Sequence, residues 1–107
     1  MTTPLLERKF HDEMIRLYRV TGEATGYWAN RYLQKVRRVG GLQAAHDALT
    51  PTADMAAGLV RLAKEHRLDL SLEYLVLQPP WRDLFTPDEL RVARERLAAV
   101  RAAHQSR

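Results

Sequence analysis

Four histidines are the first candidates for chemistry in this 107-residue chain, because imidazole can act as a metal ligand or as a general base. His11, His46, His66 and His104 fall on four different predicted helices. None of them belongs to a known ligand motif with a second histidine or a carboxylate. The chain has no cysteine, which excludes a thiolate nucleophile and a Cys/His zinc site. We therefore predict no metal site and no cofactor.

Arg61 and His66 have the spacing found in HEPN ribonucleases, an all-helical family whose motif is an arginine, four to six residues and a histidine. A chain with 14 arginines produces this spacing by chance. Leu62 also stands where that family prefers a polar residue. A HEPN-like ribonuclease is therefore a remote alternative.

Hydrolytic chemistry would need an activated hydroxyl or a pair of carboxylates in a cleft. The serines are Ser71, which suits a helix cap, and Ser106, which lies next to the chain end. Asp12 and Glu13 are neighbours on a predicted helix and point about 100° apart. Gly40 and Gly41 follow a basic helix, at the end of its dipole that repels anions. The prediction is a protein that is not an enzyme.

The stretch WANRYLQKVRRVGG, residues 28–41, concentrates positive charge. Its basic residues are Arg31, Lys35, Arg37 and Arg38. Helical spacing places them opposite an apolar side that we expect to be buried, which consists of Trp28, Tyr32, Val36 and Val39. The basic side could follow a phosphate backbone, with Arg8 or Arg16 alongside. A solvated helix face has the same pattern and is the favoured interpretation.

Helical periodicity along the whole chain predicts an all-α fold, a single domain over residues 1–107 with four or five helices. The helices are expected near 4–22, 28–39, 42–49, 55–67 and 86–104, and a short helical turn, or less favourably a strand, near 69–78. The apolar stripe of the first helix is Leu6, Phe10, Met14 and Leu17, and that of the last is Leu90, Ala93, Leu97 and Val100. We expect the first and last helices to pack over the helix that contains Trp28.

The clearest local signal is TPDE, in which Thr86 and Glu89 can form a capping box. Just before it, Pro79 and Pro80 stiffen a segment that contains Trp81 and Phe85. This segment either covers the core or exposes a protein-contact patch of Tyr74, Trp81 and Phe85. Covering the core is favoured, because an apolar residue before a helix cap packs onto the first turn.

Two segments, GYWANRYLQKVRRVGGLQAA and RLDLSLEYLVLQPPWRDLFTPDELRVARERL, together resemble an uncharacterised family of short bacterial all-helical proteins and domains. The resemblance covers residues 26–97. It implies the same helical fold, but it assigns no catalytic residue and no function.

The overall composition is that of a folded globular protein, with 46% hydrophobic and 28% charged residues and a net charge of +4. No apolar run could span a membrane, and residues 1–10 lack the layout of a signal peptide. We therefore expect a cytoplasmic protein. The leading functional prediction is a non-enzymatic module that binds another protein or itself. Sequence-independent nucleic-acid binding by Arg31, Lys35, Arg37 and Arg38 is the alternative.

Overall fold

A computed structural model describes residues 4–54 and 56–105 of the chain, and these residues form helices and no strand. The α-helices are α1 (Pro4–Thr25), α2 (Asn30–Val39), α3 (Gly41–Ala48), α4 (Ala56–Lys64), α5 (Leu72–Val76) and α6 (Pro87–Gln105), and the short 3-10 helices are η1 (Leu68–Leu70) and η2 (Trp81–Leu84). The all-α prediction is confirmed. The expected number of helices was too low, because the turn that begins at Ser71 is a separate helix.

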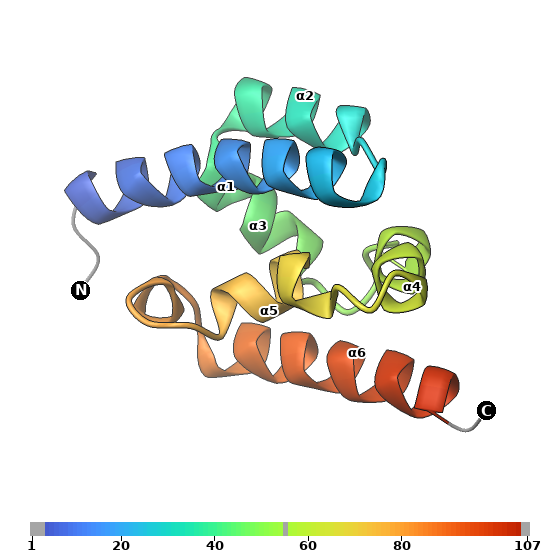
Figure 1. Cartoon of the computed structure of the whole chain (residues 1–107). Helices are drawn as coiled ribbons and strands as arrows, with labels where there is room; N and C mark the ends of the chain where they lie inside the picture. Colours follow the sequence, from blue (N-terminus) through green and yellow to red (C-terminus); the bar gives the residue numbers. More distant parts are fainter. Residues whose placement is uncertain (1–3, 55, 106–107) are drawn as a thin grey trace.

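The helices form two groups that meet at α5 (Figure 1). In one group α1 packs on α2 and α3, and in the other α6 packs on α4 and α5. The radius of gyration is 13.3 Å, which is typical of a globule of about 100 residues. The expectation that the last helix packs over α2 was wrong. Helices α2 and α6 lie on opposite sides of the molecule, because the buried stripe of α6 faces α4 and α5.

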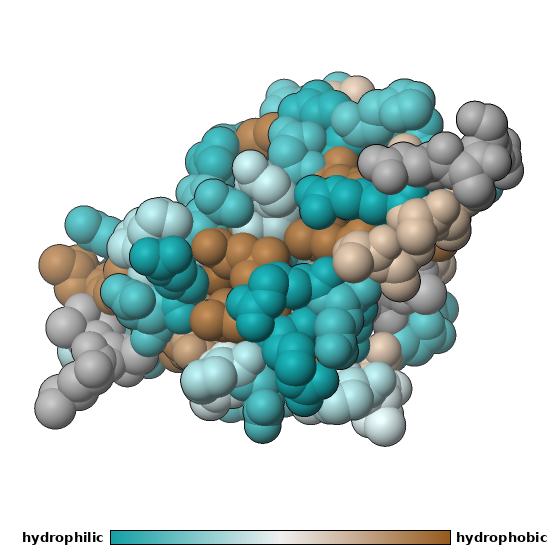
Figure 2. All heavy atoms as spheres, turned by 90° about the horizontal axis from the view of Figure 1, so that it is seen from below, coloured by the Kyte–Doolittle hydropathy of each residue, from teal (hydrophilic) through white to brown (hydrophobic). Residues whose placement is uncertain are grey.

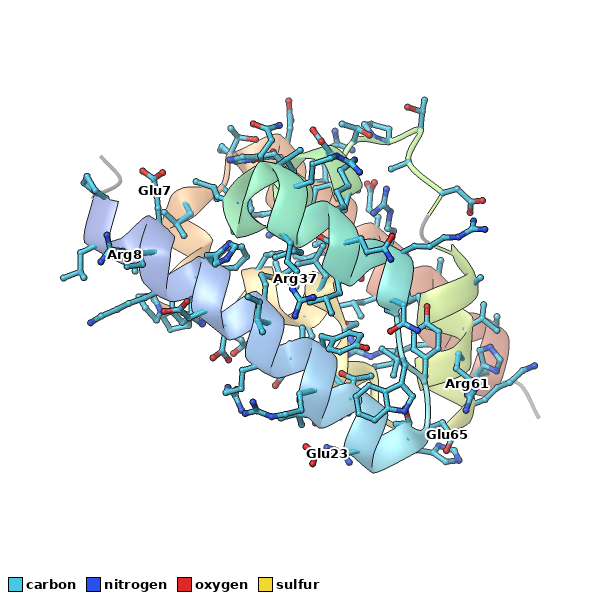
Figure 3. The ribbon with its side chains drawn as sticks, turned by 90° about the horizontal axis from the view of Figure 1, so that it is seen from above. Glu7, Arg8, Glu23, Arg37, Arg61 and Glu65 are labelled. Carbon is cyan, nitrogen blue, oxygen red and sulfur yellow. The ribbon has the colours of Figure 1, made fainter. Side chains whose placement is uncertain are left out.

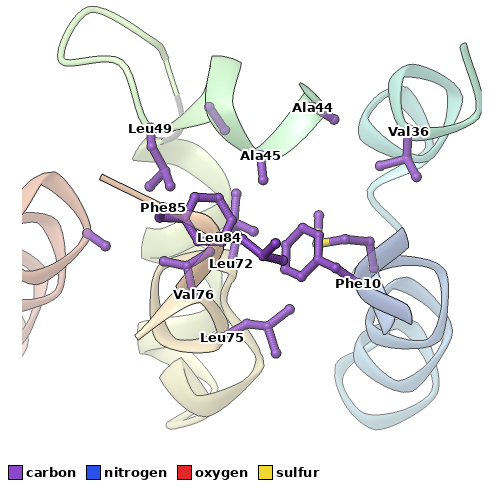
Figure 4. Close-up of a cluster of buried hydrophobic side chains, with 13 residues drawn as sticks. Phe10, Val36, Ala44, Ala45, Leu49, Leu72, Leu75, Val76, Leu84 and Phe85 are labelled. Atoms are coloured by element: carbon purple, nitrogen blue, oxygen red, sulfur yellow. The ribbon is translucent and has the colours of Figure 1, made fainter. Parts of the chain in front are cut away.

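The main core is centred on the rings of Phe10 and Phe85 (Figure 4). Phe10 has no exposed surface, and its ring centroid lies 5.5 Å from that of Phe85 and 5.7 Å from that of Trp81. A second, smaller cluster joins α4 to α6 through Leu59, Ala63, Leu97 and Val100. The predicted inner positions of α6 are therefore confirmed, except that Leu90 is only partly buried.

Side-chain caps fix the starts of α5 and α6. The Ser71 hydroxyl accepts a hydrogen bond from the Tyr74 amide (3.1 Å), as the cap prediction requires. At α6, the Thr86 hydroxyl accepts from the Glu89 amide (3.1 Å), and the Glu89 carboxylate accepts from the Thr86 amide (2.9 Å). The predicted capping box is confirmed. The other carboxylate oxygen of Glu89 lies 2.6 Å from Nδ1 of His46, and this contact connects α6 to α3.

The glycine pair Gly40–Gly41 serves two helices. Gly40 ends α2 with a positive φ of 92°, which favours glycine. Gly41 begins α3, where a Cβ would collide with the backbone of His11. Its amide donates to Nδ1 of His11 (2.8 Å). The sequence predicts only that the pair ends a helix, whereas Gly41 also starts α3.

Trp28 lies before α2, in the connection 26–29, and is 43% exposed. The prediction that it fills the core was wrong, because α1 continues to Thr25 and α2 begins only at Asn30. One side of its indole covers Gly22, where no side chain would fit, and packs edge-on against Tyr18. Val39, at the other end of α2, is also exposed. Thr3, Met55 and Ser106 lie outside the described residues.

Candidate functional site

An apolar pocket of about 120 Å³ lies between α1, α2, α4 and α5 and is partly open to solvent. We call it the tyrosine pocket, because Tyr18, Tyr27 and Tyr32 line it. Aliphatic side chains form most of the remaining wall, among them Met14, Leu17, Leu33, Leu59 and Leu62. Apolar pockets that contain a few polar groups are the usual form of small-molecule sites.

The hydroxyl of Tyr32 is buried and has no hydrogen-bond partner among the described residues. Its burial, together with the negative charge of Glu73, raises the pKa of Tyr32 well above its ordinary value. The hydroxyl therefore stays protonated and remains a donor. A buried donor without a partner is costly, and such groups are rare in native proteins.

Glu73, at the same pocket, belongs to a buried ion pair. It is 2% exposed, and Nη1 of Arg96 lies 3.4 Å from its carboxylate. Arg96 also donates to the carbonyls of Ala48 (2.6 Å) and Thr50 (2.7 Å) at the end of α3. One guanidinium therefore joins α6 to α5 and satisfies the carbonyl end of α3, where positive charge is favourable.

The buried position of Glu73 predicts a pH dependence of stability. Burial raises the pKa of Glu73, although Arg96 acts in the opposite direction. As the pH rises, the unfolded chain releases the Glu73 proton at a lower pH than the folded chain does. The contribution of protonated Glu73 to stability is therefore present below about pH 4.5 and is lost as the pH rises through the raised pKa. Relative to Glu73→Gln, the wild type should lose stability across that window. Urea unfolding at a series of pH values measures this, and parallel curves would contradict it.

Sequence reasoning missed both members of this ion pair. Glu73 is the lone charge within the apolar run LSLEYLVL, and a charge in such a run needs a buried partner. That signal could have identified Glu73. It could not have identified Arg96, which is one of six arginines after residue 80.

The structure separates the four predicted basic residues. Arg31, Arg37 and Arg38 are exposed and form no ion pair within the described part of the chain. Lys35 instead turns toward α3, with Nζ 3.0 Å from Asp47. Hydrogen bonds from Lys35 and Gln43 lower the pKa of Asp47. Figure 3 shows Arg37 on the face formed by α1 and α2.

The expected contact patch of Tyr74, Trp81 and Phe85 does not form as one exposed surface. Phe85 is 8% exposed and packs with Ala93 in the main core, so the favoured prediction that it covers the core is confirmed. Trp81 and Tyr74 are partly buried against different clusters. Apolar residues do reach the face on which α6 lies, where hydrophilic residues surround them (Figure 2).

The remaining candidate residues have structural contacts. Arg61 donates to the Thr25 carbonyl (3.0 Å), stacks over Tyr27 and lies 3.8 Å from Glu65 (Figure 3). His66 is exposed after the end of α4.

Within the described ranges, no three histidine or acidic side chains are grouped to hold a metal ion. No helix in those ranges has the length and apolarity needed to cross a membrane.

Comparisons with known proteins add no relative. The chain matches no family model, no curated protein and no solved structure. The resemblance to an uncharacterised bacterial family therefore stays a prediction.

Proposed function

We propose that this protein is a non-enzymatic, cytoplasmic binding module whose α2 surface docks onto an acidic surface of another protein. The observation that carries the proposal is the composition of this surface, which we call the arginine face. Arg31 and Arg38 share one side of α2, and Arg37 lies about 120° around the helix, toward α1. Trp28 is at one end of α2 and Val39 at the other. Trp28 and Val39 are 43% and 39% exposed. Tryptophan and arginine are the residues most enriched at the energetic centres of protein interfaces.

Exposure favours this face over the rest of the surface. Among the described residues, the large hydrophobic side chains that are exposed are Leu5, Trp28 and Val39, on α1, the 26–29 connection and α2. The apolar residues around α5 and α6 are each at least partly covered. Two of these three exposed side chains, Trp28 and Val39, belong to the arginine face.

The charge of the face indicates which kind of protein it binds. Helix α2 carries four basic residues and no acidic one, and three of the four have no counter-ion in the described part of the chain. A symmetric dimer through this face would place arginines against arginines, which is destabilising. The favoured partner is therefore a different protein with acidic side chains, and not a second copy.

Nucleic-acid binding remains the second candidate, because the same unpaired arginines could contact phosphates. Three such contacts on duplex DNA would give a log–log salt slope of about −2.7. The pairing of Lys35 with Asp47 leaves a smaller patch than the sequence indicated.

A charge-removal variant tests the arginine face. We expect Arg31→Gln/Arg37→Gln/Arg38→Gln to keep the helical fold and to lose the native partner in quantitative affinity capture, because these exposed side chains form no ion pair with any other described residue. The control is Arg94→Gln/Arg101→Gln, which removes two exposed arginines of α6 that have no ion pair with another described residue.

The captured protein is then purified and its affinity measured against all three forms of the chain. Equal binding by the triple variant, or equal loss in the α6 control, would contradict the proposal. Anisotropy titrations with duplex DNA at two salt concentrations are run in parallel. Binding of DNA with the expected slope, and of no acidic protein, would replace the proposal with the second candidate.

A further inference from the structure

The tyrosine pocket has features of a ligand site that are independent of the arginine face. Its volume is about 120 Å³, and an engineered apolar cavity of about 150 Å³ in another protein accommodates benzene. The size therefore suits a single six-membered ring, and the opening to solvent leaves room for small substituents on it.

The wall of the pocket favours an aromatic ring over an aliphatic chain. Three tyrosines line it: Tyr18 from α1, Tyr27 from the connection before α2, and Tyr32 from α2. Aromatic rings prefer edge-to-face or offset contacts with other rings. Tyr27 is held beside Gly58 of α4, where a Cβ would lie 2.9 Å from its hydroxyl oxygen. The absence of a side chain at Gly58 keeps this wall in place.

A ligand of this pocket should carry a hydrogen-bond acceptor, because the buried hydroxyl of Tyr32 has no partner among the described residues. Two other polar side chains of the pocket already have partners: the Ser71 hydroxyl donates to the Leu68 carbonyl (2.7 Å) and accepts from the Tyr74 amide, and Glu73 faces Arg96. A ligand oxygen that reaches Tyr32 would give it the partner that it lacks. The wall itself is otherwise apolar, so a charged ligand would pay a large desolvation cost.

We propose that the tyrosine pocket binds a small neutral phenol-class molecule, with its ring between the tyrosines and its oxygen accepting a hydrogen bond from Tyr32. Nothing in this assignment depends on a protein partner. The two proposals can therefore fail separately, because one concerns the outer side of α2 and the other its inner side.

Titration of the full chain with para-cresol and with toluene tests this site. Binding is measured from the shifts of amide signals in two-dimensional NMR spectra. These two probes differ only in the hydroxyl. We expect para-cresol to bind with a Kd on the order of 1 mM or below. It should bind roughly five- to tenfold more tightly than toluene, the ratio that one net hydrogen bond provides.

Tyr32→Phe should bring the two affinities to within about twofold of each other, because only para-cresol loses a contact. The variant is expected to fold at least as stably as the wild type, since it removes a buried donor that has no partner. Tyr74→Phe is the matched control, because Tyr74 packs against the smaller cluster and lies outside the pocket. It should keep the wild-type ratio.

Leu33→Trp fills the pocket from α2 and should abolish binding of both probes. The proposal is overturned if neither probe shifts the amides around the pocket, or if Leu33→Trp still binds them. It is also overturned if para-cresol and toluene bind the wild type equally, or if Tyr32→Phe and Tyr74→Phe change the ratio alike.

Discussion

Replacement of Arg96 by methionine is expected to lower the free energy of unfolding by about 3–5 kcal/mol, because the change leaves the buried Glu73 carboxylate without a counter-charge. The carbonyls of Ala48 and Thr50 also lose the hydrogen bonds that Arg96 donates to them. Urea unfolding at pH 7, followed by circular dichroism, measures the loss.

Two further variants separate this cause from simple loss of packing. Arg94→Met removes an exposed arginine that lies two residues before Arg96 on α6, and it should change stability little. Glu73→Leu/Arg96→Met removes both charges and should recover a substantial part of the loss, as replacement of a buried ion pair by apolar residues often does. A loss below about 1 kcal/mol for Arg96→Met would show that the pair is not buried in solution.

Phe85→Ala is expected to cost about 3 kcal/mol, because it leaves a cavity in the main core between Phe10 and α6. The ring of Phe85 also packs edge-on against His46, with centroids 5.2 Å apart. Chemical denaturation gives the value directly. Phe85→Leu keeps most of the volume and should cost less than half as much. A loss below about 1 kcal/mol for the alanine variant would instead place Phe85 at the surface.

The parts of the fold that were predicted correctly have strong local signals. The capping box at Thr86 and the apolar stripes of α1 and α6 depend on residues three or four positions apart, which the sequence displays directly. Helix α5 has five residues and no periodicity to detect. Its Ser71 cap was found, but its existence as a helix depends on packing against α6 and η1.

Features that depend on contacts between distant segments could not be predicted in this way. The exposure of Trp28 follows from where α1 ends and α2 begins, and the separation of α2 from α6 follows from α5 lying between the two groups. The candidate site was the least predictable part. Its wall combines residues from four helices, and the missing partner of Tyr32 is a property of the assembled pocket.

The shallow burial of α2 has a consequence for motion in the native state. Of its ten residues only Val36 is buried, whereas each of the other α-helices buries at least three residues. A helix of this length is marginal by itself in water, so its order depends on the contacts of one narrow side. Local unfolding of α2 should therefore require less free energy than global unfolding, and its amides should exchange with solvent first. Such opening would uncover the tyrosine pocket and remove Val36 from the main core, while the contact between Phe10 and Phe85 would remain.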